Sequence, residues 1–366
     1  MKRIILMTIL LFNCALFLRA QHTVSQDEME PIYKKVQTPY KYGLVVAPQD
    51  KKHMIDCPTV FHHNGLWYMT YLVFDGRGYE TWIAQSDNLL EWETKGRILS
   101  FRNNAWDKNQ RGGFPALTDM KFGGSYELQT YDDKYWMTYM GGANFGYEAI
   151  PLQVGLAWTS KENIGKVAEW ESLNVPVLSP LDENGQWFDN VCQYKSTVYW
   201  DKNKILGSQF VMFYNAAGIN PKSELKAERV GIALSEDMKN WKRYPSNPVF
   251  THEVANMITG DAHIQKIDNL YVMFYFSAHN PSRAYKAYNT FACSYDLIHW
   301  NEWKGEDLVF PTEEYDNLYA HKSYVVKHND VVYHFYCAVN KQRQRGIAVA
   351  TSKPMGKSEV CFPHLK

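Results

Sequence analysis

The chain has 366 residues, and its 39 lysine and arginine residues are balanced by 39 aspartate and glutamate residues. This balance, without clusters of basic residues, argues against nucleic acid or an anionic membrane surface as a partner. The length alone would allow two domains, but the repeat described below runs from about residue 45 to residue 352 without a linker, so we expect one folded domain.

Residues 1–20 have the features of a secretory signal peptide. Lys2 and Arg3 precede an apolar stretch, and Ala20 provides a small residue before a polar segment. The stretch is too short to span a membrane. We therefore expect a secreted or periplasmic protein, and we expect no lipid anchor because Cys14 lacks the small residues that precede a lipidated cysteine.

The next segment, residues 21–44, is polar and is expected to form a flexible leader that packs across the folded domain of residues 45–366. Five cysteines remain after the signal peptide. Cys293 and Cys337 lie inside apolar runs, so buried thiols are expected rather than a disulfide framework.

An aromatic strand returns five times along the folded domain. Its copies are residues 66–71, 134–139, 210–214, 270–275 and 331–336. A strand rich in small residues follows each copy, and after the first four a turn ends on Trp92, Trp170, Trp241 or Trp300. Self-similarity in a fixed order, with β-branched and aromatic runs, is typical of repeated β units.

We expect an all-β fold, a five-bladed β-propeller, in which each repeat forms one four-stranded sheet. Closing the sheets into a ring protects the strand edges that an open array would expose. A β-sandwich with accidental internal similarity is the alternative. The spacing between repeats exceeds the roughly 40 to 50 residues of common propellers, so long loops are expected within each unit.

Polar residues collect where the innermost strand of each blade begins. Aligning the repeats on their second strands places these residues at one rim: Asp56, Cys57, Tyr194, Lys195, Gly260, Asp261, His321 and Lys322. Blade two is less regular and offers Glu127. Because apolar residues follow, these charges would be partly desolvated, and an unpaired desolvated charge is costly. A functional site is therefore expected at this rim, although turn carboxylates that cap a neighbouring backbone are the structural alternative for each residue.

The first repeat carries a specific resemblance. Residues 55–71 resemble the first-blade motif of the five-bladed propeller glycosidases, especially glycoside hydrolase family 43 and its relatives in families 130, 117 and 32. The turns at residues 86–92, 235–241 and 294–300 are similar to the Ser-x-Asp-Leu-x-x-Trp turns of the same superfamily.

This resemblance implies a carbohydrate substrate and hydrolysis with inversion. Asp56 matches the general base of family 43, and Asp189 is the candidate for the carboxylate that adjusts the pKa of the acid. Asp261 stands near the position of the general acid but is shorter than the glutamate of the family, so Glu127 and His263 are alternative proton donors. Inversion requires one protonated and one ionised carboxyl group roughly 6.5 to 9.5 Å apart.

Further residues are candidates for binding the sugar. Trp187 could stack on a sugar ring, and the polar candidates are Tyr194, Lys195, His263, His321, Lys322 and Arg111. The same cationic residues would furnish the phosphate site of a family 130-like phosphorylase, and a non-catalytic carbohydrate-binding propeller is the third alternative. No cofactor is expected, apart from a structural calcium ion that some family members carry near the axis.

Overall fold

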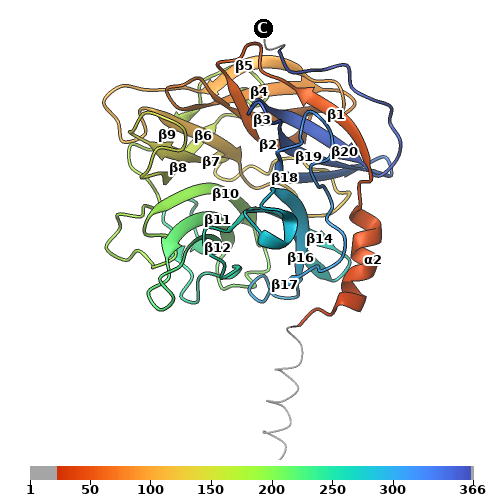
Figure 1. The fold of residues 1–366 in the computed structure, drawn as a ribbon. Coiled ribbons are helices and arrows are strands. Elements are labelled where there is room, and N and C mark those ends of the chain that lie inside the picture. The colour runs from red at the N-terminus through yellow and green to blue at the C-terminus, as the bar shows by residue number, and fades with distance from the viewer. Residues whose placement is uncertain (1–22, 364–366) are drawn as a thin grey trace, which may run out of the picture.

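The five repeats form five four-stranded antiparallel sheets arranged in a ring, so the prediction of an all-β, five-bladed β-propeller is confirmed (Figure 1). A computed structural model describes residues 23–363. Blade one consists of β2 (Met54–His63), β3 (Leu66–Phe74), β4 (Tyr79–Ser86) and β5 (Glu93–Leu99). Blade two consists of β6 (Gln110–Pro115), β7 (Tyr135–Gly142), β8 (Gln153–Thr159) and β9 (Glu171–Ser172).

The other three blades repeat this order of strands. Blade three consists of β10 (Cys192–Trp200), β11 (Phe210–Ile219), β12 (Lys226–Ser235) and β13 (Lys242–Arg243). Blade four consists of β14 (Ile258–Ile267), β15 (Leu270–Ala278), β16 (Tyr288–Ser294) and β17 (Asn301–Glu302), with a short 3-10 helix at Pro281–Arg283. Blade five consists of β18 (Tyr319–His328), β19 (Val331–Val339), β20 (Arg345–Thr351) and β1 (Tyr40–Val46).

Strand β1 closes the ring by pairing antiparallel with β20, as the outermost strand of blade five. The expected boundary at residue 45 therefore falls inside a strand, and the propeller begins at Tyr40. Before it, helix α2 (Gln26–Val36) is capped by Ser25 and packs its buried side chains against a core of blades four and five (Figure 1). The leader is thus an ordered part of the fold. The predicted signal peptide lies outside the described residues.

The tryptophan-closed turns have the predicted form. In blade three, Ser235 Oγ accepts a hydrogen bond from the Asp237 backbone, and Asp237 Oδ1 accepts from the backbone N–H groups of Lys239 and Asn240. Trp241 Nε1 donates to the carbonyl of Met238. Equivalent bonds form after β4 and β16, so these turns end their strands by satisfying the exposed backbone groups.

A β-bulge interrupts the innermost strand in four blades, near its start. The bulges lie between Asp56 and Thr59, Gln193 and Ser196, Gly260 and His263, and His321 and Tyr324. The bulged residues Cys57, Asp261 and Lys322 have φ values of 50°, 58° and 64°. A bulge re-aims a side chain, and both Cys57 Sγ, at 4.0 Å, and Lys322 Nζ, at 3.9 Å, reach the Asp261 carboxylate. The predicted alignment of these strand starts is confirmed.

A second polar interaction recurs away from the axis, a hydrogen bond between a tyrosine and a carboxylate that we call the tyrosine brace. In blades two to five the last tyrosine of the aromatic repeat donates its hydroxyl to a carboxylate, at 2.8 to 2.9 Å. The pairs are Tyr139–Asp107, Tyr214–Asp189, Tyr275–Glu302 and Tyr336–Asp316. A basic side chain contacts each carboxylate: Arg102 and Arg111, Arg243, His252, and Lys41, in that order. Each brace therefore ties a strand to a loop or outer strand, and the carboxylate is buried and ion-paired in blades two, three and five, whereas Glu302 of blade four is partly exposed.

None of the helices in the described part of the sequence is long and apolar enough to cross a bilayer. Cys57, Cys192, Cys293 and Cys337 are buried free thiols, as predicted, and Cys361 is exposed.

Candidate active site

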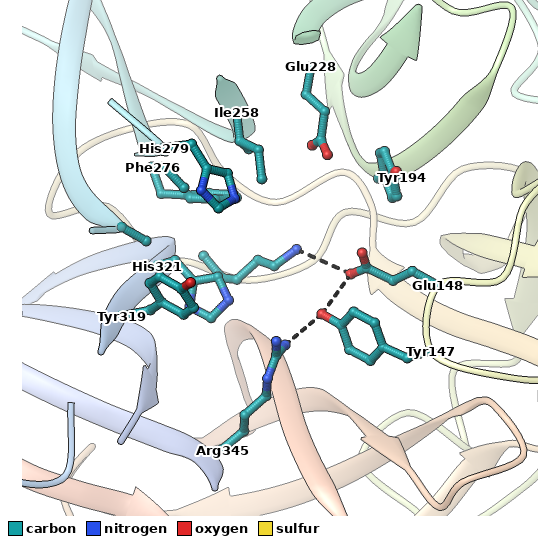
Figure 2. A pocket seen from close by; sticks show the side chains of 13 residues that line it. Tyr147, Glu148, Tyr194, Glu228, Ile258, Phe276, His279, Tyr319, His321 and Arg345 are labelled. Carbon is teal, nitrogen blue, oxygen red and sulfur yellow. Dashed lines mark hydrogen bonds and ion pairs between the residues drawn. The ribbon is translucent and has the colours of Figure 1, made fainter. Parts of the chain in front are cut away.

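A pocket of about 200 Å³ opens at the end of the propeller axis where the bulged strands begin (Figure 2). Two carboxylates line it from different blades: Glu148 lies in the loop between β7 and β8, and Glu228 lies on β12. Lys322 and Arg345, from blade five, line the facing side. The pocket therefore combines two acidic and two cationic side chains that sequence-distant segments bring together.

Glu228 is the carboxyl group of the pocket that most resists ionisation. Burial raises the pKa of Glu228 to about 7, and the neighbouring charge of Glu148 contributes to this rise, against the opposing effect of Lys322. Asn215 Nδ2 donates to Glu228 Oε2 at 2.8 Å and fixes the orientation of the side chain. Glu228 is therefore suited to hold a proton near neutral pH and to release it to a bound molecule.

Glu148 has a different environment. Burial raises its pKa, but Lys322 and Arg345 oppose that rise. Lys322 Nζ lies 3.9 Å from Glu148 Oε1, and Tyr147 Oη donates to the same oxygen at 3.1 Å (Figure 2). Oε2 has no hydrogen-bond partner among the residues the structure describes. Glu148 is therefore a proton acceptor whose Oε1 is held in place and whose Oε2 is available to a bound molecule.

Asp56 is placed behind this pocket rather than in its wall. Its side chain is buried, and Arg345 Nη1 donates to Oδ2 at 2.8 Å and to Tyr147 Oη at 2.6 Å. Burial opposes ionisation of Asp56, but the charges of Arg345 and Lys322 outweigh it, and the pKa is lowered. Asp56 is therefore an ionised anchor for Arg345, which in turn contacts Tyr147.

Asp261 is also ionisable, fully buried and on the axis. Its Oδ2 lies 3.9 Å from both Lys195 Nζ and Lys322 Nζ, and its Oδ1 has no hydrogen-bond partner within residues 23–363. Burial opposes a charge on Lys322, yet Asp261, Cys57 and Glu148 outweigh this effect and raise its pKa. The position of Asp261 fits a role in keeping Lys322 charged beneath the pocket.

His321 and Tyr194, both predicted to bind the substrate, line the pocket together with Lys322. Burial lowers the pKa of His321 to about 3, so the ring is neutral. Its Nδ1 lies 3.0 Å from the Cys337 carbonyl, which makes Nδ1 the protonated nitrogen and leaves Nε2 as an acceptor. Lys195 lies just below, in the lining of a cavity of about 10 Å³ that also touches Glu148.

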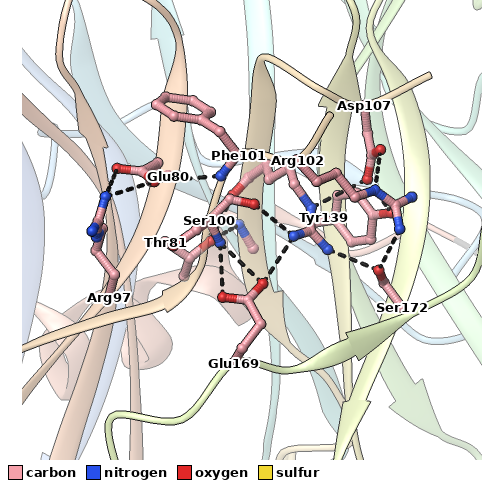
Figure 3. Close-up of polar contacts among 12 residues, drawn as sticks. Glu80, Thr81, Arg97, Ser100, Phe101, Arg102, Asp107, Tyr139, Glu169 and Ser172 are labelled. Atoms are coloured by element: carbon pink, nitrogen blue, oxygen red, sulfur yellow. Dashed lines mark hydrogen bonds and ion pairs between the residues drawn. The ribbon is translucent and has the colours of Figure 1, made fainter. Parts of the chain in front are cut away.

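Two predicted site residues belong to tyrosine braces instead. Asp189 accepts hydrogen bonds from Tyr214, Arg243 and Gln193 in blade three. Arg111 contacts Ser100, Glu169 and Ser172 beside the brace of blade two. Figure 3 shows that brace, with Tyr139, Asp107 and Arg102. Neither residue lines the pocket. Each pairs instead with an oppositely charged side chain between neighbouring strands or loops.

Three further predicted residues also lie away from the pocket. Glu127 is exposed and sits 3.7 Å from His62, at the opposite end of β2 from Asp56. His263 stacks on Tyr324 with 3.9 Å between ring centroids, and its Nδ1 accepts from the Val325 backbone. Trp187 packs beneath the guanidinium of Arg229, at 4.8 Å.

The two pocket carboxylates and Arg345 were not among the predicted site residues. Aligning the innermost strands overlooked them because Glu228 lies on the third strand of its blade and Glu148 lies in a loop. The sequence did contain one indication of Glu228. This charged residue stands three positions before residues 231–233, which belong to the small-residue strand that every blade repeats.

One cluster of side chains in the described residues has the composition of a metal site. Ligand atoms of Asp56, His321 and Cys337 lie within 4.8 Å of one another. Calcium requires six to eight oxygen ligands, whereas this cluster offers one carboxylate, already bonded to Arg345. The residues do not fit calcium.

Comparison with solved structures gives close matches over the whole propeller. A complex of BT0996 with RGII has 64% identity and a TM-score of 0.92, over 93% of this sequence and 99% of that one. A second structure, named only as a glycoside hydrolase, has 63% identity and a TM-score of 0.92 over the same shares. A thermostable family-43 glycoside hydrolase has 16% identity and a TM-score of 0.55 over 82% of this sequence and 89% of that one, a likeness of fold alone. No family profile and no curated protein matches the sequence.

Proposed function

The protein belongs to the glycoside hydrolases built on a five-bladed β-propeller, and we propose that Glu228 and Glu148 carry out its reaction. In this proposal Glu228 is the general acid that protonates the leaving oxygen of a glycosidic bond. Glu148 is the ionised carboxylate that acts at the anomeric carbon. The observation that carries the proposal is the pair of pocket carboxylates whose environments separate their protonation states.

This separation is what glycoside hydrolysis needs. One carboxyl group must keep a proton near neutral pH while another stays ionised, and different environments achieve this. The pKa of Glu228 is raised to about 7 by burial and by the charge of Glu148. Lys322 and Tyr147 both engage Glu148, and they favour its ionised form.

We further propose that the reaction inverts the anomeric configuration, with Glu148 activating a water molecule. The available oxygen Oε2 of Glu148 would take the proton of that water while Oε1 stays held by Tyr147. The roles that the family 43 resemblance implied for Asp56 and Asp189 are not carried over, because Arg345 and Arg243 occupy these carboxylates.

The substrate we propose is RGII or a glycan derived from it, the molecule present in the complex of the 64% identical neighbour. Arg345 and Lys322 would donate hydrogen bonds to its oxygens, and Tyr194 and Tyr319 line the same pocket. We also propose secretion of the protein, on the predicted signal peptide at residues 1–20.

Hydrolysis is favoured over phosphorolysis and over a purely binding role. Of the five residues suggested for a phosphate site, Arg111 and His263 are engaged elsewhere in the fold. A binding protein would have no use for two partly buried carboxyl groups with raised pKa values in one pocket, since bringing like charges together away from water is costly.

The test is turnover of an RGII oligosaccharide by the wild-type protein and by Glu228→Gln. We expect the rate to fall by about 10²- to 10⁴-fold, as for the loss of a general acid. Glu127→Gln is the matched control, because it removes an exposed carboxylate at the far end of β2. NMR of the first-formed sugar would show the inverted anomer. Full activity of a folded Glu228→Gln protein would refute the assignment, and a retained anomer would make Glu148 a nucleophile.

A further inference from the structure

Blade one lacks the tyrosine brace that the other four blades share. Its brace tyrosine, Tyr71, donates to or accepts from Thr94 at 2.8 Å, without a carboxylate or a cation. The strand register shows that Thr94 occupies the brace position. Thr94 pairs with Ala84 in β4, just as Glu302, the brace carboxylate of blade four, pairs with Ala292 in β16.

Blade one also differs in the residue that pairs with the brace tyrosine. In blades two to five this partner is small, namely Gly155, Gly231, Thr290 or Ala348. Space is tight there: a Cβ atom on Gly155 would lie 2.1 Å from the ring of Tyr139. Opposite Tyr71 stands Trp82. Blade one therefore has a second aromatic side chain, Trp82, and no carboxylate or cation at this position.

A cavity of about 80 Å³ lies at this position, between blade one and the segment that leads from β1 into β2. Its lining comprises Ala47, Pro48, Gln49, His53, Ile55, Tyr71, Val73, Trp82 and Thr94. In the described residues of the other blades, the paired side chains of the brace occupy this region. A water molecule takes up about 30 Å³ in the liquid, so the cavity has room for the edge of a larger polar molecule.

We propose that this cavity is a second carbohydrate site, which takes one edge of a neutral sugar residue. Trp82 is partly exposed and offers an apolar ring against which the C–H groups of a sugar can pack, while Gln49 and Thr94 offer hydrogen-bonding groups at the exposed rim. Tyr71 is buried and completes the lining. The lining contains no lysine, arginine, aspartate or glutamate, and Nδ1 of His53 is held by Asp50 at 2.8 Å. A charged ligand would thus find no counter-charge in the lining.

The cavity stands on the same end of the propeller as the catalytic pocket. Ile55 lines the cavity, and the adjacent Asp56 anchors Arg345 of the pocket. The two sites are therefore neighbours at the start of β2. The inference rests on the proposed function only in taking the ligand to be a carbohydrate.

Titration calorimetry of the full-length protein with an RGII oligosaccharide tests the site. The Glu228→Gln background prevents turnover, and Trp82→Ala is compared there with Trp158→Ala, a partly buried tryptophan of blade two that lines neither site. We expect Trp82→Ala to weaken binding by about tenfold, equivalent to about 1.4 kcal/mol, and Trp158→Ala to leave it unchanged. Unchanged binding by a folded Trp82→Ala protein would overturn the inference.

Thr94→Glu provides a second variant that keeps the tryptophan. It places a carboxylate where blade four has Glu302, within reach of Tyr71, and should fill and charge the cavity. We expect the same loss of oligosaccharide binding, and equal affinity in this variant would also contradict the site. In the active background, both substitutions should raise KM with little change in kcat. Failure of the proposed function would instead appear as undiminished turnover by Glu228→Gln.

Discussion

The tyrosine braces and the axial pocket both hold carboxylates away from bulk water, but they differ in the hydrogen bonds and charges that surround these carboxylates. Asp189, in a brace, accepts hydrogen bonds from Tyr214, Gln193 and Arg243, with the closest at 2.7 Å. Glu228, in the pocket, has one protein donor, Asn215, and its neighbouring charge is another carboxylate. The two kinds of site contain similar residues in one fold.

This difference distinguishes carboxylates that stabilise the fold from carboxyl groups that can take part in a reaction. A carboxylate whose lone pairs are filled by protein donors holds strands together. A carboxyl group with a raised pKa and an open side can exchange a proton with a bound molecule. The following predictions test this distinction by comparing effects on activity with effects on stability.

The largest effect is expected at Glu148. Replacing it by glutamine keeps the shape and removes the proton acceptor, so kcat should fall by about 10²- to 10⁴-fold. The melting temperature should stay near that of the wild type, because a partly desolvated charge is removed. Steady-state kinetics and thermal unfolding measure both. A large loss of stability with modest loss of activity would class Glu148 with the braces.

The opposite pattern is expected for Asp189. Asp189→Ala removes the buried partner of Arg243 and leaves it only the more exposed Asp182, and breaking a buried pair costs about 3 to 5 kcal/mol. Chemical denaturation should report this loss, while kcat below the unfolding transition should change little. A stable but inactive Asp189→Ala protein would restore the catalytic role that the sequence suggested.

The sequence predicted the fold well because its repeat records the backbone geometry directly. The aromatic second strands and the Ser-x-Asp turns fix the blades, and the aligned strand starts bring Asp56, Asp261 and Lys322 together as expected. The proposed catalytic pair was missed for a physical reason. Glu148 reaches the axis through a loop, and a loop position does not follow from strand periodicity. Asp189 was placed in the site because a buried, paired carboxylate and a catalytic one look alike in sequence, and the structure places it in a brace away from the pocket.

A smaller effect is expected at Arg345, which connects the two kinds of contact. Arg345→Lys retains a positive charge but cannot hold both Asp56 and Tyr147 in the same geometry. We expect kcat/KM to fall by about tenfold, equivalent to about 1.4 kcal/mol, with little change in melting temperature. A wild-type rate would show that the anchored guanidinium does not position Tyr147.

The smallest effect is expected in a turn that lies away from both the tyrosine braces and the pocket. Asp237→Ala removes the acceptor for two backbone N–H groups after β12 and should cost about 1 kcal/mol of folding free energy. Activity should be unchanged. Denaturant titration checks the first expectation, and any change in kcat would show that blade turns influence the pocket.

The most direct measurement is the titration of Glu228 by carbon-detected NMR, together with the pH dependence of kcat/KM. With a pKa near 7, Glu228 should be protonated below that pH, and the rate should fall as the pH rises through about 7. Because the pKa is raised from 4.5 in the folded state, the wild type should also lose stability relative to Glu228→Gln between pH 4.5 and about 7. A carboxyl group that titrates near 4.5, with a rate that does not fall through pH 7, would contradict its role as the proton donor.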